Sequence, residues 1–296
     1  MSEATDDFVL PPAPAHPRCL VYLGTPDFAV QPLRALVEAG FEVPLVVSRA
    51  DARRGRGSHT TPSPVKAAAL ELGLPVSDRV DDVLDAGADL GVVVAFGRII
   101  KPHVLAVLPM VNLHFSLLPR WRGAAPVERA ILAGDERTGV DLMVVEEGLD
   151  TGGVYDRAEV TIDPDETVDE LRARLIAAGT RLVVDNLTRG LGVPKPQDGE
   201  TTYAHKIEPA ELQIDWSRPA LDIHRLVRVG GAWTTFHGKR LKLWRTSLAP
   251  VDDGVPAPTG SGPLQLVEVQ PEGKPRMAAR AWANGARWNG SEPLGS

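Results

Sequence analysis

The strongest constraint on the fold is a series of short apolar runs that alternate with segments of helical spacing. The runs are continuous rather than alternating in polarity, and they occupy residues 18–24, 41–48, 90–96, 110–114 and 140–145. Helical spacing occupies residues 28–39, 63–72, 127–133 and 167–187. Continuous apolar strands that alternate with helices are typical of a parallel sheet covered on both faces. We therefore predict an α/β fold built on a mostly parallel sheet.

Composition divides the chain of 296 residues into four parts. Residues 1–17 are acidic and proline-rich and lack the basic start and apolar stretch of a signal peptide, so we expect a disordered lead-in. Residues 18–189 hold the apolar runs and are expected to form a Rossmann-like domain. Residues 190–208 are rich in Gly, Pro and polar side chains, which is typical of a linker. The short strand patterns in residues 209–296 predict a small β-rich second domain.

Charge and cysteine content exclude several classes of protein. The net charge of −7 argues against a generic nucleic-acid binder, although basic side chains outnumber acidic ones in residues 209–296. The single cysteine, Cys19, excludes an intramolecular disulfide and a cysteine-based zinc site. No apolar run approaches the roughly 18–20 residues that cross a bilayer. These features favour a cytoplasmic protein.

The first apolar run leads into Gly24-Thr25-Pro26-Asp27-Phe28. This turn is neither the GxGxxG of a dinucleotide-binding sheet nor the GxxxxGK[ST] of a nucleotide phosphate loop. A dehydrogenase and an NTPase are therefore both disfavoured.

Three polar residues are candidates for catalysis. Asn112 and His114 are two apart on a predicted strand and point to the same face of the sheet, while Asp150 lies in the loop after the next strand. Ligands of parallel sheets bind beyond the carboxyl ends of the strands, which selects the loops after Phe96, His114 and Val145. An amide donor, an imidazole and a carboxylate without a protein nucleophile suit direct attack of an amine on a carbonyl carbon.

Plainer interpretations of these residues also exist. An Asn-x-His pair on a strand is more often structural, and aspartate, as at position 150, is common in turns and helix caps. Ser116 is not in a GxSxG turn, so a serine nucleophile has little support. Three polar groups at one sheet edge favour catalysis but do not identify a reaction.

The segment SLLPRWRGAAPV at residues 116–127 closely resembles the signature of methionyl-tRNA formyltransferases. The Asn-x-His, SLLP and GLDTG parts are shared with the wider folate-dependent formyltransferase family. The resemblance covers about residues 20–244. It also includes GTPDFA at residues 24–29, the arginine-glycine insert at residues 54–66 and QIDWS at residues 213–217.

The resemblance implies a reaction and a set of roles. The formyl donor would be 10-formyltetrahydrofolate, the acceptor would be the amino group of initiator methionyl-tRNA, and no metal is implied. Asn112 would stabilise the oxyanion, His114 would donate to it or shuttle a proton, and Asp150 would orient His114. The expected folate-binding residues are Phe96, Gly97, Arg98, Ile99, Ser116, Leu117, Leu118, Pro119, Glu146, Glu147, Gly148 and Leu149.

The tRNA contacts expected from the resemblance lie in the insert and in the second domain, which is OB-like in this family. They are Arg53, Arg54, Arg56, Lys239, Arg240 and Lys242, and the basic set continues with Arg225, Arg228 and Arg245. We expect Trp233, Phe236 and Trp244 to be core residues rather than stacking platforms. A monomer is expected.

Four features depart from the family pattern. Phe115 replaces a small residue beside His114 and is expected to narrow the pocket, and Gly153 replaces an acidic residue or proline. The RVGGAW segment at residues 228–233 differs, and the region after Pro250 is short, which predicts a shortened second domain lacking a hairpin. Two alternatives remain open, namely formylation of an amino sugar or another small amine, and a non-catalytic folate- or RNA-binding homologue.

Overall fold

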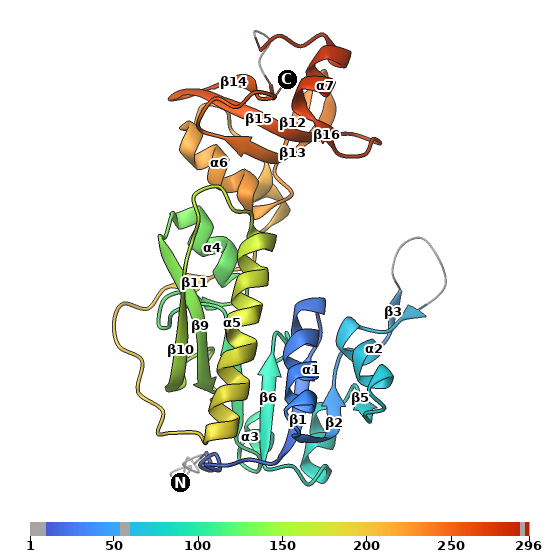
Figure 1. The fold of residues 1–296 in the computed structure, drawn as a ribbon, viewed down its shortest axis with the longest axis vertical. Coiled ribbons are helices and arrows are strands. Elements are labelled where there is room, and N and C mark those ends of the chain that lie inside the picture. Colours follow the sequence, from blue (N-terminus) through green and yellow to red (C-terminus); the bar gives the residue numbers. More distant parts are fainter. Residues whose placement is uncertain (1–9, 54–59, 291–293, 296) are drawn as a thin grey trace, which may run out of the picture. The chain divides into compact units, whose positions relative to one another are not determined.

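The computed structural model describes residues 10–53, 60–290 and 294–295. The chain divides into two compact units (Figure 1). Unit 1 comprises the chain up to Ala124 together with Thr138–Val160 and Ala173–Ala204, and unit 2 comprises Ala125–Arg137, Thr161–Arg172 and the residues from His205 onward. Unit 2 therefore includes two short segments of the stretch that the sequence assigned to the first domain.

Unit 1 is built on a seven-stranded sheet with the strand order β10-β9-β7-β6-β1-β2-β5. The strands are β1 (Cys19–Gly24), β2 (Glu42–Val47), β5 (Val76–Ser77), β6 (Leu90–Val94), β7 (Met110–His114), β9 (Arg137–Val144) and β10 (Val154–Thr161). Strands β5, β2, β1, β6 and β7 pair in parallel. The predicted mostly parallel α/β sheet is thus confirmed.

One strand departs from the parallel order. Strand β9 runs antiparallel to β7, with Val111 opposite Val144 and His114 opposite Asp141. The end of β9 therefore lies beside the beginning of β7, so the chain leaves β9 at the edge of the sheet opposite to His114.

Helical segments alternate with the strands, and local signals set several of their ends. In unit 1 they are η1 (Asp27–Ala29), α1 (Val30–Glu38), α2 (Pro64–Glu71), η2 (Val80–Asp85), α3 (Pro102–Leu105) and, from Ala173 onward, α5 (Val168–Arg189), whereas α4 (Pro126–Ala133) belongs to unit 2. The hydroxyl of Ser63 accepts the Lys66 N–H, and Pro64 occupies the first position of α2. Helix α4 ends at Gly134, whose φ of 75° is left-handed. No helix among the described residues combines the length and apolar content needed to cross a membrane.

The segment expected to be a linker is packed onto unit 1. Its end forms β11 (Tyr203–Ala204), which pairs with β8 (Arg122–Gly123), and Figure 1 shows the chain after α5 returning along β10 to reach this point. A separate two-stranded pair joins β3 (Ala52–Arg53) to β4 (Thr60–Thr61).

The described part of the lead-in also contacts unit 1. The Leu191 N–H donates to the Ala15 carbonyl at 2.7 Å, and Pro17 is buried. Residues 10–17 thus differ from the expected disordered segment, and residues 1–9 lie outside the described part of the chain.

Unit 2 contains a five-stranded sheet in which β12, β13, β15 and β14 follow one another and β16 pairs with β15. Its elements are η3 (Pro209–Leu212), α6 (Ala220–Val229), β12 (Trp233–Phe236), β13 (Lys239–Ser247), β14 (Val255–Thr259), β15 (Gly262–Pro271), β16 (Met277–Ala278) and α7 (Ala279–Ala286). The predicted β-rich second domain is confirmed. The region after Pro250 supplies β14, β15, β16 and α7, and Trp282 and Trp288 complete its core.

Candidate active site

Strand β7 places the first two candidate residues. Asn112 and His114 are opposite Met143 and Asp141 of β9, so all four side chains belong to one face of the sheet. The His114 ring is buried, while Asn112 is partly exposed. Among the described residues, the Asn112 amide has no hydrogen-bond partner, which leaves both of its donors available to a ligand.

The His114 imidazole lies between two acceptors. Its Nε2 is 2.9 Å from the Trp121 carbonyl, and its Nδ1 is 3.6 Å from Oδ2 of Asp150. A carbonyl oxygen can only accept, so Nε2 carries a hydrogen and donates it to Trp121. The Nδ1 side then faces a carboxylate across a gap slightly longer than a hydrogen bond.

Asp150 reaches this position through a loop that folds back along the sheet. Its backbone is left-handed, with φ of 52°, and its Oδ2 accepts the Gly123 N–H at 2.8 Å. The next glycine, Gly152, has no space for a side chain, because an added Cβ would lie 2.1 Å from the Val144 carbonyl oxygen. The loop therefore returns from the far edge of the sheet to His114 along a path that requires glycine.

The loop after β7 is held by its own polar groups. A cis peptide joins Leu118 to Pro119, and the buried Ser116 hydroxyl donates to the Arg120 carbonyl at 2.6 Å. Ser116 thus ties the loop together, in agreement with its lack of a nucleophile motif. Asp150 thus lies 3.6 Å from His114, and Asn112 lies on the same face of β7, while the catalytic roles of the three residues stay predictions.

Comparison with known proteins identifies the family of the chain. Residues 18–187 match the formyl transferase family, and residues 206–287 match the formyl transferase C-terminal domain. The chain is a member of the formyl transferase family.

Two relatives cover most of the chain. The methionyl-tRNA formyltransferase of Roseobacter denitrificans is 46% identical over 90% of this chain and 95% of its own length. The methionyl-tRNA formyltransferase of Symbiobacterium thermophilum is 42% identical over 90% of this chain and 92% of its own length. The resemblance to this group that the sequence indicated is thereby confirmed.

The fold is also found among solved structures. The N-formyltransferase of Helicobacter canadensis, solved with folinic acid and dTDP-3-aminofucose, aligns with a TM-score of 0.65 and 17% identity. The alignment covers 84% of this chain and 98% of that one. At this identity the likeness shows a shared fold.

In this formyl transferase, two of the three predicted folate loops, at residues 96–99 and 116–119, begin at the same edge of the sheet as His114, while the loop at residues 146–149 follows β9 from the opposite edge. Residues 96–99 follow β6, which pairs in parallel with β7. Phe96 is buried, its carbonyl accepts the Thr25 hydroxyl at 3.2 Å, and the Arg98 guanidinium lies 4.5 Å above its ring. Ile99 is exposed, as is Leu149 in the loop at residues 146–149, so both apolar side chains are accessible to a ligand.

The two leucine side chains of the SLLP segment are packed within unit 1. Leu118 is buried against Met143 and Val154, and the Leu117 side chain packs over Gly139. Phe115 is also buried, and its ring meets the Phe28 ring edge-on at a centroid distance of 5.8 Å. The bulky residue that the sequence placed beside the catalytic strand is therefore a packed aromatic partner of Phe28.

An ion pair between buried Asp141 and partly exposed Arg157 fixes the Leu118 peptide unit and was not predicted. Oδ2 of Asp141 accepts the Leu118 N–H at 2.9 Å and the Arg157 guanidinium at 2.9 Å, and Arg157 also donates to the Leu118 carbonyl at 3.2 Å. Burial raises the pKa of the Asp141 carboxyl to about 6, against the opposing effect of Arg157 and the Leu118 N–H. Nothing in the sequence pattern marked Asp141, because its strand reads as continuously apolar around it.

The predicted tRNA contacts fall in two places. Arg53 is exposed in β3, and Arg54 and Arg56 lie outside the described residues. Lys239, Arg240 and Lys242 lie on β13 of unit 2.

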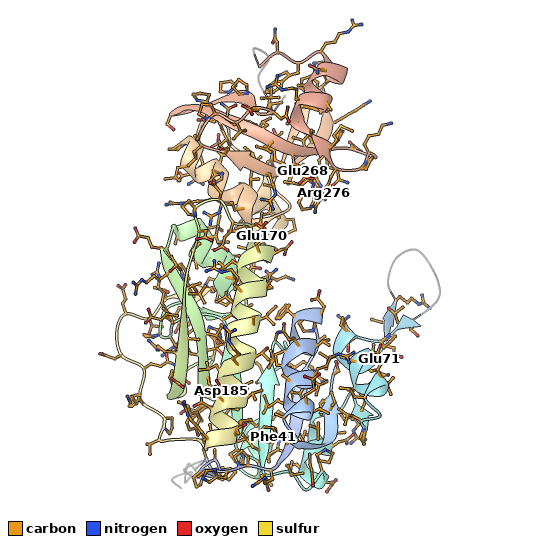
Figure 2. The ribbon with its side chains drawn as sticks, viewed as in Figure 1. Phe41, Glu71, Glu170, Asp185, Glu268 and Arg276 are labelled. Atoms are coloured by element: carbon orange, nitrogen blue, oxygen red, sulfur yellow. The ribbon has the colours of Figure 1, made fainter. Side chains whose placement is uncertain are left out.

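Unit 2 carries a surface in which cations stack on indole rings, which we call the cation–indole surface (Trp233, Arg240, Lys242, Trp244 and Arg276). The Arg240 guanidinium lies 3.9 Å above Trp233, and that of Arg276 lies 3.4 Å above Trp244. Lys242 lies 5.9 Å from the Trp244 ring centre, and Figure 2 labels Arg276 beside the sheet. The two tryptophans, expected in the core, are only partly buried.

Three other arginines of unit 2 contact groups within that unit. Arg228 is buried and donates to the Glu166 and Asp163 carbonyls at 2.8 and 2.9 Å, while Arg245 pairs with Glu170. The Arg225 guanidinium packs over Gly134. The basic residues near α6 thus hold the unit together rather than extend the cation–indole surface.

Proposed function

We propose that this chain transfers the formyl group of 10-formyltetrahydrofolate to the amino group of initiator methionyl-tRNA. The supporting observation is the match to methionyl-tRNA formyltransferases over 90% of the chain, which spans both units. A small-amine acceptor has no comparable support. We also propose that the enzyme acts as a monomer in the cytoplasm, where initiator tRNA is used, and that it needs no metal.

The reaction forms one bond and breaks one. The amine nitrogen attacks the formyl carbon, and the carbonyl electron pair moves to oxygen. The bond to the donor nitrogen of the folate then breaks as the carbonyl re-forms. One proton leaves the attacking nitrogen and one is gained by the folate nitrogen, so the proton count balances.

Asn112 is proposed to stabilise the developing oxyanion. Its amide is partly exposed and, within the described residues, is not committed to another protein group. A neutral donor that is already in place strengthens as negative charge develops on the oxygen. It therefore lowers the barrier without holding the uncharged carbonyl too tightly.

His114 and Asp150 are proposed to move the proton. The Trp121 carbonyl fixes one side of the imidazole, which leaves Nδ1 as the nitrogen that exchanges a proton. The Asp150 carboxylate lies 3.6 Å from Nδ1 and stabilises the positive ring that forms. The proton taken from the amine is then available to the departing folate nitrogen.

The folate is proposed to lie against the loops at residues 96–99, 116–119 and 146–149. Exposed Ile99 and Leu149 offer apolar contacts to a flat ring, and backbone groups at the sheet edge offer polar ones. The tRNA is proposed to bind the cation–indole surface, with guanidinium groups on phosphates and indole rings beside unpaired bases.

The test is a competition between acceptors. Purified enzyme and 10-formyltetrahydrofolate are given charged initiator methionyl-tRNA, the same tRNA uncharged, or a nucleotide-linked amino sugar. We expect formylation of the charged tRNA alone, with an apparent KM that rises steeply with salt. Transfer to the amino sugar without transfer to the tRNA would contradict the proposal.

A further inference from the structure

The chain after α5 forms an ordered strap across both catalytic loops, at residues 194–204. Backbone hydrogen bonds of 2.8 Å run in both directions between Val154 and Lys195. Further along, the Thr202 hydroxyl accepts the Trp121 N–H and the Thr202 carbonyl accepts the Arg122 N–H, both at 2.9 Å. The strap therefore touches the loop after β7 and the start of β10.

The contact at Gly153 is close. A Cβ added there would lie 3.1 Å from the Lys195 carbonyl oxygen and 3.2 Å from Cβ of Pro194. The strap thus packs so closely against the end of the Asp150 loop that a side chain larger than that of glycine would be crowded at position 153.

One side chain of the strap links the two catalytic loops. The Gln197 amide nitrogen donates to the Asp150 and Gly152 carbonyls, each at 2.8 Å. Its oxygen accepts from Nε and from a terminal nitrogen of Arg122, at 3.1 and 2.6 Å. Both donors and the acceptor oxygen of this partly buried amide are thus used.

These bonds close a ring around the catalytic carboxylate. Gln197 holds the Asp150 backbone, the Asp150 carboxylate accepts the Gly123 N–H, and the neighbouring Arg122 side chain returns to Gln197. Asp150 needs such support because its φ of 52° is a left-handed conformation that costs a non-glycine residue energy. Within this ring, the Gln197 side-chain amide contacts both loops at once.

We infer that Gln197 is a positioning residue that holds the Asp150 loop so that the carboxylate faces His114 during formyl transfer. This inference rests on the proposed function for its catalytic consequence. Gln197 touches no reacting atom and acts only through Asp150. The amide type matters, because in a carboxylate one oxygen would still pair with Arg122, while the other would replace the amide nitrogen and face the Asp150 and Gly152 carbonyls as an acceptor.

Two substitutions separate the strap from the Asp150 loop. Gln197→Glu keeps a partner for Arg122 and removes both donors, and Gln197→Ala removes every contact. The control is Glu200→Gln, a substitution of an exposed side chain on the same strap. We expect both Gln197 variants to lose about 10- to 100-fold in kcat, as small displacements of catalytic groups do. In both Gln197 variants, the KM for folate should change less than about twofold. In Glu200→Gln, neither kcat nor this KM should change by more than about twofold.

A double-mutant cycle tests the route of the effect. In an Asp150→Asn background, Gln197→Ala should cause no further loss of kcat, because its effect passes through that carboxylate. Multiplicative losses would overturn the inference, as would a rise in the KM for folate with kcat unchanged.

Hydrogen exchange of the peptide covering residues 146–153 separates the inference from the proposed function. We expect faster exchange in Gln197→Ala than in the wild type and in Glu200→Gln. Unchanged exchange would overturn the inference, even in a fully active enzyme. A wild type that fails to formylate methionyl-tRNA would instead contradict the proposed function, and the exchange result would still decide whether Gln197 holds the loop.

Discussion

The catalytic loops of unit 1 and the cation–indole surface of unit 2 are built in different ways. In unit 1, the polar groups are fixed by short bonds to backbone atoms, as in the 2.9 Å contact from His114 to Trp121 and the 2.8 Å contact from Gly123 to Asp150. In unit 2, long cationic side chains lie over indole rings, as Arg240 lies over Trp233.

This difference fits the functions that we propose for the two regions. Formyl transfer requires a few atoms held within a fraction of an ångström, and directional bonds hold His114 and Asp150 in place. Affinity for a polyanion depends on charge density, and it tolerates side chains that move. Substitutions in unit 1 should therefore change turnover, while those on the cation–indole surface should change apparent affinity in a salt-dependent way.

The largest expected effect comes from the two residues of β7. His114→Ala should lower kcat by several orders of magnitude, and Asn112→Ala by about 10²–10³, as for removal of one oxyanion donor. Folate binding, measured by calorimetry, should be unchanged in both variants. The control is His103→Ala, since that ring is half-exposed and pairs with Asp81 at the surface. Turnover retained in His114→Ala would remove this residue from the mechanism.

The next effect tests how rigid the Asp150 loop is. Gly152→Ala should lower kcat at least about 10-fold and destabilise the fold by about 1–3 kcal/mol, because the new methyl group meets the Val144 carbonyl. Gly192→Ala is the matched control, since its Cβ would meet nothing within 4 Å. Thermal unfolding and steady-state kinetics measure the two quantities. A Gly152→Ala enzyme indistinguishable from the control would show that the loop is not constrained.

A moderate effect is expected on the cation–indole surface. Replacing Arg240 and Arg276 together by alanine should raise the KM for methionyl-tRNA about 10-fold without lowering kcat. The slope of log KM against log salt should decrease by roughly one for each lost phosphate contact. The Arg34→Ala/Arg218→Ala pair removes the same two charges from surface pairs with Glu71 and Asp222 and serves as the control. An equal change in both enzymes would indicate a general charge effect.

The last effect concerns Asp141 and changes only the pH dependence of stability. Its pKa is raised to about 6, so the folded state favours the protonated carboxyl. Its contribution to stability is therefore fully present below about pH 4 and is lost as the pH rises through about 6. Between pH 4 and pH 7, the free energy of unfolding of the wild type should fall relative to Asp141→Asn by on the order of 2–3 kcal/mol. Denaturant unfolding across this range measures the difference, and parallel curves would contradict the assigned shift.

The sequence predicted the sheet because its apolar runs are long and uninterrupted. It also led to Asp150, although by an incomplete argument. The rule about carboxyl ends of parallel strands does not apply to β9, which is antiparallel to β7. Asp150 reaches His114 because its loop folds back along the sheet, and this path depends on tertiary contacts such as that between Gly123 and Asp150.

The contacts of other residues could not be predicted from the sequence pattern. Gln197 lies in a stretch whose Gly, Pro and polar content is typical of a linker, and only the folded chain brings it to Asp150 and Arg122. Arg276 is separated from Trp244 by a long stretch of chain, so their stacking depends on how β15 pairs with β13. Composition predicts where a segment can bend, but it does not show which side chains meet.

The central claim is that unit 1 determines the rate of formyl transfer and unit 2 the affinity for tRNA. It is tested most directly by single-turnover formylation of methionyl-tRNA over a range of tRNA concentrations. The wild type is compared with one variant from each region, His114→Ala and the Arg240→Ala/Arg276→Ala pair. We predict that the first loses the maximal rate and keeps the half-saturating tRNA concentration, while the second raises that concentration and keeps the rate. If the His114 variant changes only the half-saturating concentration, or the arginine pair abolishes the maximal rate, chemistry and tRNA affinity are not divided in this way.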